Sequence, residues 1–280
     1  MALSSVTDEA LRRLARSAWR GIEQGARRVE GAKRGPSGVA AEPVDPEFLP
    51  VHIMGLNLLA AADHARMMSA VITDTKLGPS AATIARGALE NFARVHWISV
   101  GATGDEVKAR ALHVLRKDVQ DSPWTSNFTS KHPERQPISR RRYIDVIEGH
   151  LGDLGVRGLN WSLSQAIADL SEKQWQHFDP RVPYSNLSSI AHGGLPGLAM
   201  LVADGQTLRL PRQEVINQVG VVLGVADKAV HALQRCPLPI LPEQCVPEQW
   251  ESLMVELNPT ILKLKAEDRF STPVMKKAKA

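Results

Sequence analysis

Cysteines, aromatic residues and long apolar runs are all scarce in this sequence. Its two cysteines, Cys236 and Cys245, cannot build a disulfide framework in a chain of 280 residues, and we expect both to be reduced thiols. No stretch approaches the ~18 apolar residues of a membrane-spanning helix, which argues against a membrane partner. Charged residues at positions 8, 9, 12 and 13 interrupt the place where a secretory signal needs its apolar segment. These absences predict a soluble, cytoplasmic protein.

The sequence also lacks the motifs of the common cofactor and metal sites. It contains no G-x-G-x-x-G and no phosphate-binding P-loop, which argues against the usual nucleotide cradles. H-E-x-x-H and E-x-x-H are missing, so helical zinc and di-iron sites lack their spacing. The absence of a G-x-S-x-G elbow argues against a serine hydrolase. We therefore predict no cofactor and no metal, with a metal held by His64, Glu90 and His192 as an alternative.

Alanine and leucine are abundant, and their helical periodicity predicts the fold. Start and stop signals place helices at about 7–31, 46–74, 80–101, 105–120, 139–154, 162–174, 184–192, 212–235 and 247–257. The one predicted pair of strands is a short hairpin near 198–210, around Asp204-Gly205. The predicted fold class is all-α, with a core bundle of about six to eight helices.

Prolines and glycines indicate how the bundle is divided. We predict an N-terminal helix and linker at 1–45, a bundle core at 46–235, and a proline-rich strap, short helix and basic tail at 236–280. The helix at 46–74 is apolar almost all round, so we expect it at the centre of the bundle. The small and apolar residues of GVVLGVADKAV can support a homodimer, although packing within the core explains them equally well.

The segment YSNLSSIAHGG, residues 184–194, combines a polar helix face with a complete lack of formal charge. At about 100° per residue, one face collects its polar side chains, which are Tyr184, Ser185, Ser188 and His192. A solvated face usually recruits lysine, glutamate or arginine, so we expect this one to be partly enclosed and hydrogen-bonded. Close approach of another helix over the small serines, and a ligand or catalytic site, are both consistent with this pattern.

A second polar group lies in ARGALENFARVHW. Arg86 and Glu90 are four residues apart, the spacing of an intrahelical ion pair, and their helical phase is close to that of Trp97. An exposed pair contributes only about 0.2–0.5 kcal/mol, whereas an enclosed pair is costly to desolvate and needs further partners. On the helix at 46–74, Asn57 and His64 share one stripe of an otherwise apolar surface and must also form hydrogen bonds.

The ordered pattern AADH, ARGALENFARVHWI, YSNLSSIAHGG resembles a family of uncharacterised, all-helical proteins frequent in actinobacteria, over about residues 50–235. Two of its motifs, R-x-x-L-E before a tryptophan and Y-x-x-L-S-x-x-x-H, are matched by Arg86, Glu90, Trp97, Tyr184, Leu187, Ser188 and His192. The resemblance implies a helical bundle in which these polar positions recur. More distantly the chain resembles HEPN-type bundles, but the arginine followed after four to six residues by histidine, found in the RNA-cleaving members, is absent.

Three functions follow as hypotheses. In the first, His64, Arg86, Glu90, Tyr184 and His192 converge in an enclosed pocket of a binding or regulatory protein, which holds a small molecule or a nucleic-acid element. Arg86 then engages an anionic group and Glu90 orients Arg86. In the second, the protein is an enzyme in which His192, oriented by Glu90 or Tyr184, is the general acid/base and Arg86 stabilises negative charge. The third is a structural or assembly protein without a ligand.

Overall fold

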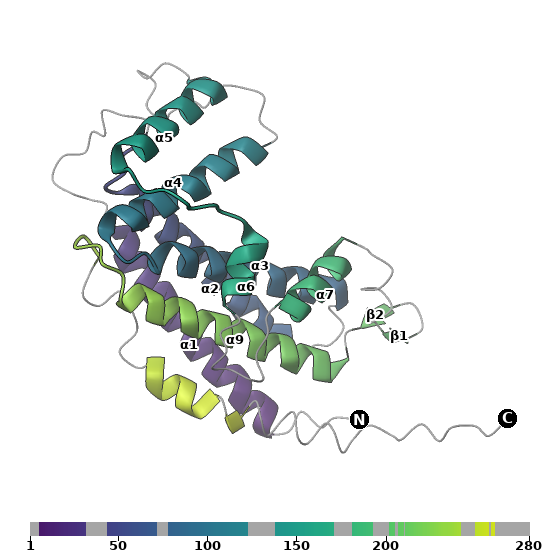
Figure 1. The fold of residues 1–280 in the computed structure, drawn as a ribbon. Coiled ribbons are helices and arrows are strands. Elements are labelled where there is room, and N and C mark those ends of the chain that lie inside the picture. The colour runs from purple at the N-terminus through teal and green to yellow at the C-terminus, as the bar shows by residue number, and fades with distance from the viewer. Residues whose placement is uncertain are drawn as a thin grey trace.

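The chain forms the predicted all-α bundle, as the computed structural model shows (Figure 1). The structure describes residues 6–31, 44–71, 78–122, 138–170, 181–192, 202–204, 207–209, 211–241, 250–257 and 259–260. Most of the chain between the predicted helices at 7–31 and 46–74, most of that between the helices at 105–120 and 139–154, the basic tail and Cys245 lie outside these residues. None of the described helices is long and apolar enough to cross a membrane.

The elements agree closely with the predicted order along the chain. The labelled helices are α1 (Val6–Gly31), α2 (Leu49–Val71), α3 (Gly78–Ser99), α4 (Gly104–Asp121), α5 (Arg140–Leu154), α6 (Leu163–Asp169), α7 (Arg181–Ala191) and α9 (Arg212–Gln234). A further helix covers 250–257. The predicted hairpin corresponds to two short antiparallel strands, β1 (Val202–Asp204) and β2 (Thr207–Arg209).

Three predicted helix starts are wrong. α7 begins at Arg181, three residues before the predicted start at Tyr184. α2 begins at Leu49 instead of Pro46, because residues 46–48 form a turn in which an Asp45 carboxylate oxygen accepts the amide hydrogen of Glu47 at 2.9 Å. α3 begins at Gly78, two residues before the predicted start at Ser80. The residue after Gly78 is a proline, whose fixed φ suits the first turn of a helix.

α3, and not α2, is the central helix of the bundle. Among the described elements α3 packs against α2, α4, α6, α7 and α9, whereas α2 leaves Leu56 and Met67 exposed. The N-terminal half of α3 is rich in buried alanines, namely Ala81, Ala82, Ala85 and Ala88. These small side chains let several helices approach the α3 backbone, which an apolar pattern alone does not reveal.

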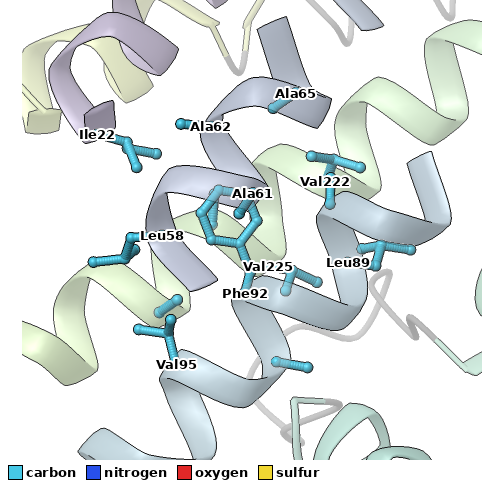
Figure 2. Close-up of a cluster of buried hydrophobic side chains, with 14 of the residues drawn as sticks. Ile22, Leu58, Ala61, Ala62, Ala65, Leu89, Phe92, Val95, Val222 and Val225 are labelled. Atoms are coloured by element: carbon cyan, nitrogen blue, oxygen red, sulfur yellow. The ribbon is translucent and has the colours of Figure 1, made fainter. Parts of the chain in front are cut away.

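One hydrophobic core joins elements from both ends of the chain. Phe92 of α3 lies among side chains of α1, α2 and α9, including Ile22, Leu58 and Val225 (Figure 2). Trp250 of the helix at 250–257 belongs to the same cluster. The predicted boundaries at 45 and 235 therefore do not mark the edges of this core.

The α9 segment considered for dimerisation is used inside the chain. Its valines, leucine and alanines belong to the core cluster, and α9 packs against α3. The structure therefore supports the core-packing interpretation of GVVLGVADKAV, and the homodimer stays a prediction.

Candidate functional site

Four side chains from α3 and α7 form a connected polar cluster. Arg86 Nε donates to Glu90 Oε1 at 2.6 Å, and Arg86 Nη1 lies 2.6 Å from His192 Nε2. The Tyr184 hydroxyl donates to the same Glu90 Oε1 at 3.1 Å. The Arg86 guanidinium carbon also lies 5.8 Å from the centre of the Tyr184 ring. We call Arg86, Glu90, Tyr184 and His192 the α3–α7 cluster.

The two helices hold this cluster in place through ordinary packing. Leu187 and Ile190 of α7 are buried in the core, and α7 contacts α3. Tyr184, Ser188 and His192 follow one another at intervals of four residues. Their side chains therefore lie in one row along the polar face of this helix. The amphipathic pattern of YSNLSSIAHGG thus predicted correctly which face of this helix carries the polar groups.

The Arg86–Glu90 pair is neither fully exposed nor fully buried. Its side chains retain 22% and 25% of their accessible surface. Removing one partner should therefore cost more than the ~0.2–0.5 kcal/mol of an exposed helical pair and less than the ~3–5 kcal/mol of a fully buried one. The pair is a semi-enclosed site of opposite charges.

Glu90 controls the protonation of its neighbours. Partial burial lowers the pKa of Arg86, but the hydrogen bond and charge of Glu90 outweigh it, so this pKa lies above its ordinary value. Partial burial, with the charge of Glu90, raises the pKa of Tyr184. Arg86 therefore stays charged, and the Tyr184 hydroxyl stays protonated and can donate to Glu90.

The contact with Arg86 defines the state of His192. A guanidinium has five N–H donors and no acceptor, so the nitrogen that faces it must accept. His192 Nε2 is consequently unprotonated in this arrangement, and the hydrogen of the neutral imidazole is on Nδ1. The His192 side chain is exposed, so its Nδ1 hydrogen can be offered to a molecule arriving from solvent.

His64 reaches α3 beside the cluster through a contact that the sequence analysis missed. A Cβ atom built on Gly87 would lie 2.8 Å from His64 Nε2 and 2.9 Å from His64 Cδ2. The imidazole therefore occupies the space that the side chain of any other residue would take. A glycine inside a helix costs about 1 kcal/mol relative to alanine. Its presence at position 87 is therefore the feature of the sequence that indicates close approach of another group.

Trp97 and Asn57 do not join the cluster. Trp97 lies eleven residues beyond Arg86 on α3, which is about 16 Å along the helix axis. The two residues share a helical phase, but phase gives no information on the distance along the axis. Its ring lies 4.9 Å from that of Trp161 and 4.9 Å from the Arg110 guanidinium carbon. The Asn57 side chain donates to the carbonyl of Ile53 on its own helix at 2.8 Å, which satisfies it locally.

The polar face of α7 is partly enclosed, as expected, because Tyr184 and Ser188 are half-buried while Ser185 and His192 are exposed. One further expectation needs correction. Neither Glu90 nor Tyr184 orients His192, because Glu90 Oε1 accepts from Arg86 and from the Tyr184 hydroxyl instead. Arg86 is the group that contacts the His192 imidazole.

No three histidine, cysteine, aspartate or glutamate side chains within the described ranges are placed to hold a metal ion. His64, Glu90 and His192 do not form such a group. Comparisons with protein-family models, with curated proteins and with solved structures each gave no match. The resemblances to the actinobacterial family and to HEPN-type bundles stay predictions.

Proposed function

We propose that the protein binds a small anionic molecule, a carboxylate or a phosphate, at the α3–α7 cluster. The observation that carries this proposal is the contact between Arg86 Nη1 and His192 Nε2 at 2.6 Å. Glu90 occupies Nε of the guanidinium, and His192 occupies one N–H of Nη1. The remaining N–H groups can donate in parallel to two oxygens of a carboxylate or phosphate.

The roles of the other residues follow from their contacts. Glu90 fixes the guanidinium plane through Nε, and Tyr184 fixes Glu90 in turn. Such second bonds keep a recognition group in one orientation before the ligand arrives, which lowers the entropic cost of binding. His192, exposed at the end of α7, adds a hydrogen-bond donor through Nδ1.

Calorimetric titration with inorganic phosphate, and separately with succinate, tests this proposal. We expect wild type to bind the anion and Arg86→Gln not to bind it. Glutamine keeps a polar side chain but provides neither the positive charge nor the two parallel N–H donors of the guanidinium. Arg94→Gln is the matched control, since Arg94 lies on the same helix, is 27% exposed and is paired with Asp118 at 2.7 Å. Equal binding by wild type and Arg86→Gln would contradict the proposal.

The enzyme and structural hypotheses give different results in the same variants. In the enzyme alternative, His192 acts as general acid/base. The contact between Arg86 and His192 Nε2 must then break before this nitrogen can accept a proton from a substrate. Turnover that His192→Gln abolishes while ligand binding persists would favour this alternative. A large loss of stability in Arg86→Gln, with no anion bound by wild type, would favour a structural role.

A further inference from the structure

The outer face of α1 carries a row of arginines that does not belong to the α3–α7 cluster. α1 buries one face in the core through residues such as Leu11 and Trp19. The opposite face exposes Arg13, Arg16 and Arg20, which we call the arginine stripe. At about 100° and 1.5 Å per residue, the three lie within an arc of about 60° and span about 10.5 Å of helix axis.

No described residue forms an ion pair with the stripe. The carboxylates on the same side of α1, Glu9 and Glu23, are paired with Arg12 and Arg27. Arg16 and Arg20 are like charges four residues apart, an arrangement that destabilises a helix by about 0.2–0.5 kcal/mol. An external anion that bound the stripe would remove this repulsion.

We propose that the arginine stripe binds the phosphodiester backbone of double-stranded nucleic acid. Arginine forks match phosphate oxygens in a bidentate geometry. One strand of a duplex presents a phosphate about every 3.4 Å along its axis, so the length of the stripe corresponds to about three phosphates. The contact uses the backbone alone and is therefore independent of base sequence.

A lipid surface fits the stripe less well. Amphipathic helices bind a bilayer by inserting their apolar face between the lipids. The apolar face of α1 is already buried, with Trp19 and Ile22 each 2% exposed in the core. Only charge attraction would remain for a membrane, whereas a duplex also offers a continuous row of phosphates along each strand.

The start of α5 supplies a matched control with the same charge. Arg140, Arg141 and Arg142 are consecutive, so their directions differ by about 100° from one residue to the next. These side chains cannot align on one phosphate row as the stripe does. Replacing either set with glutamine removes three positive charges and leaves the core untouched.

Fluorescence anisotropy with a labelled 20-base-pair duplex DNA, repeated with duplex RNA and across a salt series, tests the proposal. For duplex DNA we expect binding that does not depend on base sequence and whose log K falls linearly with the logarithm of the salt concentration. Each phosphate contact contributes about 0.9 to the slope of this plot. The slope should therefore be about 2.7 shallower in the triple variant Arg13→Gln, Arg16→Gln, Arg20→Gln. The α5 triple variant should keep the wild-type slope. Circular dichroism melting confirms that both variants fold.

Three outcomes would overturn this inference. The first is no wild-type binding to either duplex at about 100 µM protein in low salt. The second is an equal change of slope in both triple variants, which would mean that overall charge matters and the stripe does not. The third is stripe-dependent binding to vesicles containing phosphatidylserine with no binding to either duplex. Binding to only one of the two duplexes supports the inference and identifies the nucleic acid.

Discussion

At the residue scale, His96 on α3 has the most strongly perturbed pKa among the residues that the structure describes. Burial, together with the positive charge of Lys228, lowers the pKa of His96 to about 4. Its Nδ1 atom is buried and has no hydrogen-bond partner among the described residues. A protonated imidazole is therefore poorly accommodated here, and the neutral form is the one compatible with the folded chain.

This burial predicts acid sensitivity. The unfolded chain binds a proton at His96 near pH 6.5, the folded chain only near pH 4, so protonation favours unfolding. The contribution of neutral His96 to the free energy of unfolding is fully present above about pH 6.5. It is lost as the pH falls towards 4, which lowers the free energy of unfolding by on the order of 3 kcal/mol. Urea denaturation across this window should show a weaker decline in His96→Leu than in wild type. His231→Gln, on α9, is the control. An unchanged decline in His96→Leu would contradict this account.

The sequence predicted part of the site at this scale. The i,i+4 spacing identified Arg86 with Glu90, and the neutral polar face identified Tyr184 with His192, because helical phase is a property of local sequence. Phase could not exclude Trp97, which needs the distance along the axis. It also could not show that Gly87 makes room for His64, because that contact joins two helices.

At the element scale, the start of α4 is fixed by side-chain caps. Thr103 Oγ1 accepts the amide hydrogen of Glu106 at 3.2 Å, and Glu106 Oε2 accepts that of Ala102 at 2.9 Å. The bond from the Ala102 backbone lowers the pKa of Glu106, so its carboxylate remains charged at the positive end of the helix. Arg110 then bonds Glu106 at 2.7 Å and the carbonyl of Trp97 at 3.0 Å, which links α4 to α3.

Removing the cap should have a local and moderate effect. Thr103→Ala leaves the Glu106 amide without its acceptor and should lower the free energy of unfolding by about 1 kcal/mol, whereas Thr103→Ser should change it much less. Chemical denaturation followed by circular dichroism measures both. A loss in Thr103→Ser equal to that in Thr103→Ala would show that the threonine methyl group, and not the cap, stabilises this turn.

Helix starts also show which local signals suffice. Ser139, at the predicted start of the helix at 139–154, caps α5 by accepting the amide hydrogen of Arg142 at 3.3 Å. The prediction failed at Ser80, because a glycine-proline step starts α3 two residues earlier. Several residues in one stretch can begin a helix, and the choice among them depends on tertiary contacts that sequence patterns do not contain.

At the scale of the whole molecule, the bundle has a core shared by distant segments. Trp19 of α1 lies 6.1 Å from Phe92 of α3, ring centre to ring centre. The Trp250 indole N–H donates to Asp227 of α9 at 2.8 Å, which ties the helix at 250–257 to the bundle. Composition and periodicity predicted the all-α class, but they could not show that α1 is an integral part of the core.

The shared core predicts cooperative unfolding. Trp19→Ala should lower the free energy of unfolding by about 3–5 kcal/mol, the usual cost of removing a buried tryptophan. α1 should not unfold on its own, so circular dichroism and tryptophan fluorescence should report one coincident transition. A separate early transition of small amplitude would show instead that α1 is a detachable extension.

The central claim is that Arg86 and His192 together form an anion-binding site, and nitrogen NMR tests it most directly. In ¹⁵N-labelled protein we expect phosphate to shift the Arg86 Nε–H and both imidazole nitrogens of His192, while the Arg94 Nε–H stays constant. Without ligand, the His192 nitrogens should show the neutral form with its hydrogen on Nδ1. Saturable shifts of both residues would confirm the account. Shifts spread over many surface arginines, or a His192 signal that does not respond, would contradict it.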